Sequence, residues 1–166
     1  SSGEEAHSLG VICQQFKELH PDFTYQIIGT DISNEMIHLC QAATYGDKSI
    51  SLFKTLKPEA FVKFMRKTSD DRYQPVPEIK SRIRFQQHNL FKPFMAKENF
   101  DLILLRNVLI YFTPADQEKV LGLVENNLSE KGLLMIGESE SLTHIKTAFQ
   151  YVEPLVYKKV VLDKVA

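Results

Sequence analysis

The chain has 166 residues, of which 43% are hydrophobic and 25% charged, and its formal net charge at pH 7 is −1. This length and composition are those of one globular domain with a real core, and they exclude a disordered or fibrous protein. A net charge so close to zero argues against a dedicated nucleic-acid binder. The sequence has no signal-peptide pattern and no long apolar span, so we expect a cytoplasmic protein without membrane insertion.

The cysteines and histidines do not indicate a metal site. Cys13 and Cys40 each lie in a helix-like pattern with apolar neighbours, which favours small buried side chains in a reducing compartment. They form no CxxC pair, and the five histidines are scattered along the chain. We therefore predict that no metal is bound.

The first 46 residues predict a helix, a strand and a second helix. Apolar residues recur at helical spacing over residues 4–19. A short strand follows at 25–29, and Asp31 lies just beyond it. Ser33 is a favoured cap for the second helix, which we expect to stop at Gly46.

Residues 47–82 interrupt this alternation. The stretch 56–67 predicts a basic amphipathic helix with Pro58 in its first turn. The polar stretch that follows carries Pro75 and Pro77, so any strand there must lie at a sheet edge. We interpret 47–82 as an insertion.

The alternation resumes after residue 82. The predicted elements are strands at 83–87, 100–105 and 132–137, a helix at 113–128 capped by Thr113, and an antiparallel pair within 151–162. Strands that alternate with helices predict an α/β fold whose mostly parallel sheet is covered on both faces.

Four polar residues lie where predicted strands end: Asp31, Asn89, Arg106 and Asn107. Ligands of open parallel sheets bind outside the carboxyl ends of the strands. Arginine is rarely buried without a partner, so packing alone does not explain Arg106 at the end of the most apolar strand. A ligand site at this edge explains all four residues.

Most of the candidates also have a structural alternative. Asp31 either accepts the two hydroxyls of a ribose or caps the next helix, and the absence of GxGxxG argues against a dinucleotide. Glu5 either faces a positively charged group or completes a capping box with Ser2. Asn89 either contacts an adenine edge or turns the chain. Tyr111 either directs its hydroxyl to the ligand or packs as a core aromatic with a hydrogen-bonded tip.

Five stretches resemble the CheR family in their order and spacing. They are SSGEEAHSL at 1–9, GTDIS at 29–33, FQQHNLF at 85–91, FDLILLRNVLIYF at 100–112 and LSEKGLLMIGESESL at 128–142. Members of this family are S-adenosylmethionine-dependent methyltransferases that esterify receptor glutamates in bacterial chemotaxis. The resemblance covers nearly the whole chain, and RNVLIYF and NLF are its most specific parts.

The resemblance implies a fold and a domain organisation. It implies a Rossmann-like class I methyltransferase sheet, mostly parallel, with an antiparallel terminal hairpin. Residues 1–166 would form the methyltransferase domain, and about 47–82 the family's inserted β-subdomain, which can hold receptor tails.

The resemblance also implies that residues upstream of the chain matter. The family has a helical domain and a first strand before the SSGEE turn, so we expect a fragment that needs its upstream residues. The first strand would lie between 27–29 and 102–105, which we expect to be interior strands. Without it, unpaired backbone groups would line a central slot, and we expect the isolated chain to be unstable or to aggregate.

The site residues follow from the same resemblance. Glu5 would lie at the methionine end of the cofactor and Asp31 at its ribose. Asn89 and Leu90 would border the adenine. The remaining residues, which would lie near the reactive methyl, are Arg106, Asn107 and Tyr111, and the catalytic roles fall to Arg106 and Tyr111.

The implied chemistry fits a site without a general base. A glutamate carboxylate is anionic at neutral pH and needs no base to attack a sulfonium methyl, so catalysis comes mainly from orientation. Arg106 would hold the substrate carboxylate, and S-adenosylhomocysteine would be the product. The expected partner is the cytoplasmic domain or the tail of a chemoreceptor.

Two stretches, GEEAHS at 3–8 and GESES at 137–141, depart from the family's pattern. Ala6 and His7 stand where a proline and an aromatic residue are common, and Glu138 stands where histidine is frequent, which adds negative charge near the site. Two alternatives to glutamate methylation therefore stay open. The chain could be a non-catalytic CheR-like docking module, or a methyltransferase for another acceptor.

Overall fold

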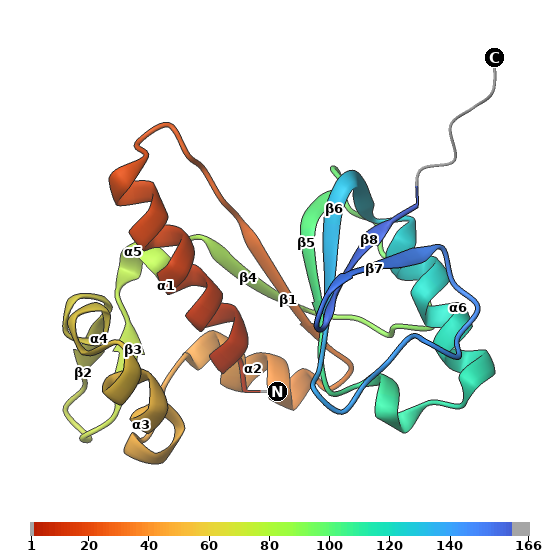
Figure 1. The fold of residues 1–166 in the computed structure, drawn as a ribbon. Helices are drawn as coiled ribbons and strands as arrows, with labels where there is room; N and C mark the ends of the chain where they lie inside the picture. Colours follow the sequence, from red (N-terminus) through yellow and green to blue (C-terminus); the bar gives the residue numbers. More distant parts are fainter. Residues whose placement is uncertain (1, 161–166) are drawn as a thin grey trace. The chain divides into compact units, whose positions relative to one another are not determined.

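A computed structural model describes residues 2–160 of the chain (Figure 1). The chain forms two compact units, Ser1–Asn89 and Leu90–Ala166. Each unit has its own sheet and its own buried apolar side chains. The predicted α/β class is confirmed, because parallel strand pairs occur in both units together with helices, and an antiparallel hairpin closes the chain.

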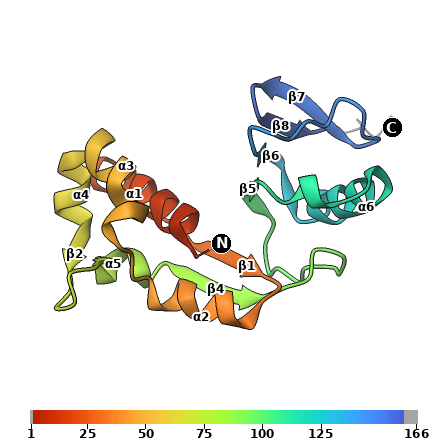
Figure 2. The ribbon, with the colours of Figure 1, turned by 90° about the horizontal axis from the view of Figure 1, so that it is seen from below.

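The described part of the first unit has five helices and four strands. In chain order they are α1 (Glu4–Leu19), β1 (Ile27–Asp31), α2 (Asn34–Ala42), α3 (Asp47–Leu56), α4 (Pro58–Phe64), β2 (Met65–Lys67), β3 (Tyr73–Pro75), α5 (Pro77–Lys80) and β4 (Ile83–Gln87). Strands β1 and β4 pair in parallel (Figure 2), and β2 and β3 form a separate antiparallel pair. The predicted helix at 4–19 and the predicted strand at 83–87 are confirmed.

Helix α1 packs closely on one face of the β1–β4 pair. A Cβ atom at Gly10 would lie 2.8 Å from Ile79 and 3.0 Å from Ile83, so glycine permits this approach. Ile83 is buried, whereas Ile28 and Arg84, which alternation directs to the opposite face, are exposed. That helices cover both faces of this strand pair stays a prediction.

Helix α2 ends earlier than its sequence predicts. Ala43 adopts the left-handed conformation with φ 50°, and its N–H donates to the Leu39 carbonyl. The predicted stop at Gly46 is wrong, since Gly46 precedes the first residue of α3. Ala43 is almost fully buried. Tertiary packing therefore offsets the cost of a left-handed conformation that glycine would adopt freely.

The segment after α3 also differs from its sequence pattern. Helix α4 begins at Pro58 as predicted but stops at Phe64, because Met65–Lys67 pairs with Tyr73–Pro75 as an antiparallel hairpin. The strand with Pro75 therefore lies at the edge of a two-stranded sheet, as its prolines predict. Strand pairing here overrides helical periodicity.

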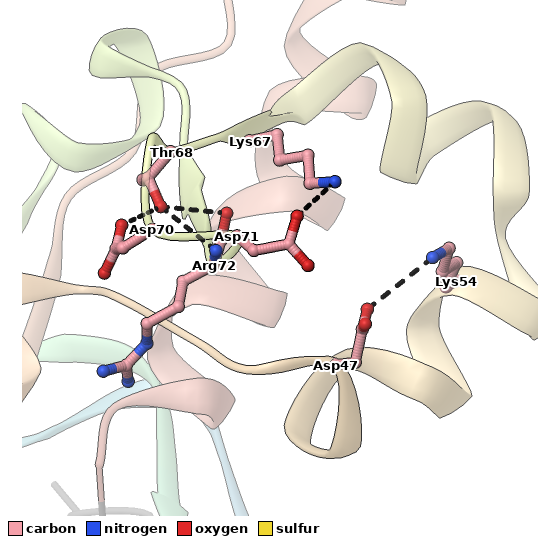
Figure 3. A network of polar contacts seen from close by, with 7 residues as sticks. All are labelled: Asp47, Lys54, Lys67, Thr68, Asp70, Asp71 and Arg72. Carbon is pink, nitrogen blue, oxygen red and sulfur yellow. Dashed lines mark hydrogen bonds and ion pairs between the residues drawn. The ribbon is translucent and has the colours of Figure 1, made fainter.

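Polar side chains stabilise the turn between β2 and β3 (Figure 3). Asp71 takes a left-handed conformation with φ 62°, and the Thr68 N–H donates to the Arg72 carbonyl at 2.8 Å. The Thr68 hydroxyl donates to Asp70 and accepts from the Arg72 N–H. Lys67 and Asp71 form an exposed ion pair, which contributes little on its own. The turn is therefore held mainly by the hydrogen bonds of Thr68.

The second unit is a four-stranded sheet with one long helix. Its elements are β5 (Phe100–Leu105), the short 3₁₀ helix η1 (Leu109–Tyr111), α6 (Pro114–Glu125), β6 (Leu128–Ile136), β7 (Phe149–Glu153) and β8 (Val156–Lys159). The strand order is β5-β6-β8-β7, and only β5 and β6 are parallel. The predicted strand at 100–105, the terminal hairpin and the cap at Thr113 are confirmed. Residues 161–162 of the predicted pair lie outside the described residues.

Helix α6 covers the apolar cluster of this unit. Val120 and Leu121 are fully buried against Leu134 and Ile136 of β6. The Thr113 hydroxyl accepts from the Asp116 N–H at 3.3 Å and so satisfies a donor at the first turn of the helix.

Strands β1 and β5 each have one strand partner among the described residues. β1 pairs with β4, and β5 pairs with β6. They are therefore edge strands of the described sheets, and the expectation that a further strand lies between them and makes both interior stays a prediction. No described segment pairs with the second edge of either strand. Within residues 2–160, no helix has both the length and the apolar character needed to cross a membrane.

A buried histidine joins the start of α1 to the rest of the first unit. His7 is only 5% exposed, and its ring lies 5.7 Å from the Tyr45 ring and 5.4 Å from the Phe85 ring, centroid to centroid. Nδ1 lies 2.9 Å from the Gly3 carbonyl oxygen and 2.6 Å from the Tyr45 hydroxyl. A carbonyl can only accept, so the geometry assigns the proton to Nδ1, and Tyr45 donates onward to the Ser2 carbonyl. His7 thus fills an aromatic position and adds a hydrogen bond.

We predict that His7 makes the stability of the protein depend on pH near neutrality. Burial lowers the pKa of His7, the Lys80 charge lowers it further, and the Gly3 hydrogen bond opposes both effects. The unfolded chain therefore takes up a proton first as the pH falls. The stabilisation is complete above about pH 6.5 and is lost as the pH falls through the lowered folded pKa, at up to about 1.4 kcal/mol per pH unit.

Urea unfolding at a series of pH values checks this expectation in the wild type and in His7→Phe. The pKa of His88 is also lowered by burial, but it contributes equally to both proteins. The difference between them therefore reports His7. Identical pH dependence in the two proteins would contradict the assignment.

Candidate functional site

Asp31 lies at the carboxyl end of β1 as an ionised acceptor. Its Oδ1 accepts from the Ser33 N–H at 2.9 Å. Burial acts to raise the pKa of this carboxyl, but the N–H groups of Ser33 and Ile32 are among the groups that lower it, and the pKa is below its ordinary value. The cap of α2 is Ser33, whose hydroxyl accepts from the Met36 N–H. The helix-cap alternative for Asp31 is therefore wrong.

Asn89 lies near the same sheet edge as Asp31. Asp31 and Gln87 are partners in the β1–β4 register, and the His88 N–H donates to the Asp31 carbonyl at 2.9 Å. Asn89 follows His88 and is half-buried. The first unit thus brings Asp31 and Asn89 to one edge, as the strand pattern predicts. Leu90 belongs to the second unit and packs against its apolar cluster.

Glu5 lies in the first turn of α1, after a glycine turn. The capping box of Ser2 and Glu5 is wrong: the cap position is Gly3, which makes no side-chain cap, and the Ser2 hydroxyl donates to Glu4. Gly3 has φ 90°, and a Cβ there would lie 3.2 Å from the Tyr45 hydroxyl and 3.3 Å from Cys40. Both the conformation and the space require glycine. Glu4 and Glu5 together make this helix start acidic.

The second unit holds Arg106, Asn107 and Tyr111 on one turn. Arg106 and Asn107 follow β5 directly and are exposed, and Asn107 has φ 57°. Tyr111 ends η1 and is 78% exposed, so the core-aromatic alternative is wrong. The second unit therefore presents these three side chains together, whereas Glu5, Asp31 and Asn89 belong to the first unit.

Two buried or half-buried polar side chains hold this turn, and the sequence reasoning missed both. Glu140 accepts hydrogen bonds from the backbone N–H groups of Asn107, Val108 and Leu109. Gln117 of α6 donates to the carbonyls of Leu109 and Phe112 at 3.0 and 3.1 Å. The sequence feature that could have indicated Glu140 is its place three residues after Gly137, in the loop that follows β6.

Comparison with known proteins gives the family. Residues 1–157 match the family described as CheR methyltransferase, SAM binding domain. The chain belongs to this family. A chemotaxis protein methyltransferase of Vibrio parahaemolyticus is 32% identical over 163 residues, which are 95% of this chain and 58% of that protein. One from Borreliella burgdorferi is 31% identical over 162 residues, with 96% of this chain and 56% of that protein covered.

This chain spans little more than half the length of these curated relatives. Among solved structures, PKMT2 from Rickettsia typhi in complex with AdoHcy is similar over 73% of this chain and 17% of that chain, at 18% identity and a TM-score of 0.42.

S-adenosylmethionine is the cofactor of the CheR SAM-binding domain, and residues of this chain fit it. An ionised carboxylate at the end of β1 suits the hydroxyls of a ribose. The acidic start of α1 suits an ammonium group rather than a phosphate.

We predict that Gly137→Ala destabilises the protein. The new Cβ would lie 2.8 Å from the Asn107 backbone nitrogen and 2.9 Å from Glu140 Oε2, so the turn after β5 must shift. Overpacking of this kind costs about 1–3 kcal/mol in urea unfolding. The matched control is Gly122→Ala in α6, where a Cβ meets nothing within 4 Å. That change should stabilise the protein by about 0.5–1 kcal/mol. A Gly137→Ala protein as stable as the wild type would contradict the tight contact.

Proposed function

We propose that this chain is the methyltransferase domain of a protein-glutamate O-methyltransferase that acts on a chemoreceptor. The observation that carries the proposal is the turn after β5, which presents Arg106 and Asn107 at a strand end in a family that binds S-adenosylmethionine. The curated relatives named chemotaxis protein methyltransferase support the same function. The cofactor supplies an electrophilic sulfonium methyl when it is bound.

On the cofactor side, the proposal assigns one recognition task to each residue. Asp31 accepts hydrogen bonds from the ribose hydroxyls, and its lowered pKa keeps it ionised for this. Glu5 pairs with the ammonium group of the methionine part. Asn89 and Leu90 border the adenine, one through its amide and the other through apolar contact. Asn107 lies near the reactive methyl together with Arg106.

On the substrate side, Arg106 and Tyr111 orient a carboxylate. The glutamate of the receptor is anionic at neutral pH and is the nucleophile, so no residue needs to remove a proton. Two parallel N–H donors of Arg106 fix the plane of the carboxylate, and the Tyr111 hydroxyl lies close by to contact it. The product ester has lost its negative charge, so the grip of Arg106 weakens after transfer and the product can leave.

The partner in this proposal is the cytoplasmic domain of a chemoreceptor or its tail, which places the enzyme in the cytoplasm. Residues of about 47–82 would act as the inserted β-subdomain of the 1–166 methyltransferase domain. They form α3, α4, the β2–β3 hairpin and α5, with a separate apolar cluster of Tyr45, Ile50, Phe61 and Met65.

We predict that Arg106→Ala lowers methyl transfer much more than cofactor affinity. Loss of a charged hydrogen-bond pair should lower kcat/KM for a chemoreceptor fragment about 10- to 150-fold. Affinity for S-adenosylmethionine, measured by calorimetry, should change much less. Arg106→Lys should not restore full activity, because lysine lacks the planar pair of donors.

The matched control for this experiment is Lys131→Ala, which removes an exposed positive charge from the same unit. It should transfer methyl groups like the wild type. Equal losses of transfer and affinity in Arg106→Ala would make Arg106 a cofactor-binding or structural residue. A wild type that binds the cofactor but methylates no receptor would support the docking-module alternative instead.

A further inference from the structure

The Glu140 carboxylate gathers four backbone N–H groups. Oε1 accepts from Val108 at 2.8 Å and from Leu109 at 2.7 Å. Oε2 accepts from Asn107 at 3.0 Å and from Gly137 at 2.6 Å. Three of these donors come from the turn after β5, and the fourth comes from the end of β6, the neighbouring strand. One side chain thus joins the ends of two parallel strands.

Glu140 is buried, so its carboxylate needs hydrogen-bond donors to offset the loss of hydration. Glu140 is only 9% exposed, and a buried carboxylate is costly unless its oxygens are hydrogen-bonded. With two N–H donors on each oxygen, the carboxylate is well compensated, and three N–H groups of the turn and one at the end of β6 are satisfied at once. An amide in place of the carboxylate has one acceptor oxygen instead of two, so it can accept from only part of this set.

The N–H groups that Glu140 holds are those of the candidate catalytic turn. Asn107 needs a left-handed conformation, which an asparagine adopts at some cost, and its N–H is one of the four donors. Gly137 lets the two strand ends approach, since a Cβ there would lie 3.0 Å from the Asn107 side-chain nitrogen. Arg106 immediately precedes the held residues, so the direction of its side chain depends on this turn.

We propose that Glu140 is a positioning residue for methyl transfer. Its carboxylate fixes the turn at 107–109, and through it the orientation of Arg106 and Asn107 toward the cofactor and the substrate. This inference rests on the proposed function for the roles of Arg106 and Asn107. The hydrogen bonds of Glu140 are independent of the proposed function.

The test compares Glu140→Gln with Glu130→Gln, which makes the same change at an exposed position of β6. In the wild type, NMR should show slow hydrogen exchange and downfield shifts for the amides of Asn107, Val108, Leu109 and Gly137. In Glu140→Gln this protection should fall about 10-fold or more, because part of the set loses its acceptor. Glu130→Gln should leave these amides unchanged.

Methyl transfer is measured on the same proteins. Glu140→Gln should lower kcat about 10- to 100-fold, as a misplaced catalytic group does, with a much smaller change in cofactor affinity. Glu140→Asp keeps the charge with a shorter side chain and should recover part of both the protection and kcat. Unprotected amides at 107–109 in the wild type would overturn the proposal without any variant, and so would lost protection with unchanged kcat. A wild type with protected amides but no transfer would instead contradict the proposed function.

Discussion

The hydrogen bonds from four backbone N–H groups to Glu140 set the conformation of the turn that carries Arg106, Asn107 and Tyr111. A turn that follows a parallel strand has several backbone groups without a strand partner, and a loop at a ligand-binding edge cannot satisfy them with another strand. The Glu140 carboxylate accepts from these N–H groups, and Gln117 donates to the carbonyls of Leu109, at the start of η1, and Phe112, just after it.

A comparable arrangement supports the start of α1 in the first unit. Gly3 makes the turn, the His7 ring donates to the Gly3 carbonyl, and the Tyr45 hydroxyl donates to the Ser2 carbonyl. In both units, buried polar side chains bind the backbone of a turn and leave the acidic or basic side chains of that turn exposed or half-exposed. The backbone of each turn determines where its site residues lie. That backbone is held by side chains distant in sequence, Glu140 in one unit and Tyr45 in the other.

The parts of this fold that local sequence dictates were predictable. Helix α1 and strands β4 and β5 have the predicted bounds because helical spacing and apolar runs are strong local signals. The end of α2 at Ala43 and the strand at Met65–Lys67 were not predictable, since tertiary packing and pairing with Tyr73–Pro75 decide them. The proximity of Asp31 and Asn89 followed from the expected alignment of strand ends in a parallel sheet. Glu140 did not, because 31 to 33 residues separate it from the N–H groups it binds in the turn after β5.

The central proposal is that residues of each unit, those at the end of β1 and those on the turn after β5, recognise S-adenosylmethionine. The direct measurement is a titration of the isotopically labelled protein with S-adenosylhomocysteine, followed by amide chemical shifts. We predict that the amides of Asp31 and Ser33 and those of Asn107 and Leu109 shift together and give a single Kd. Shifts in only one of these two groups, or two different Kd values, would contradict the account.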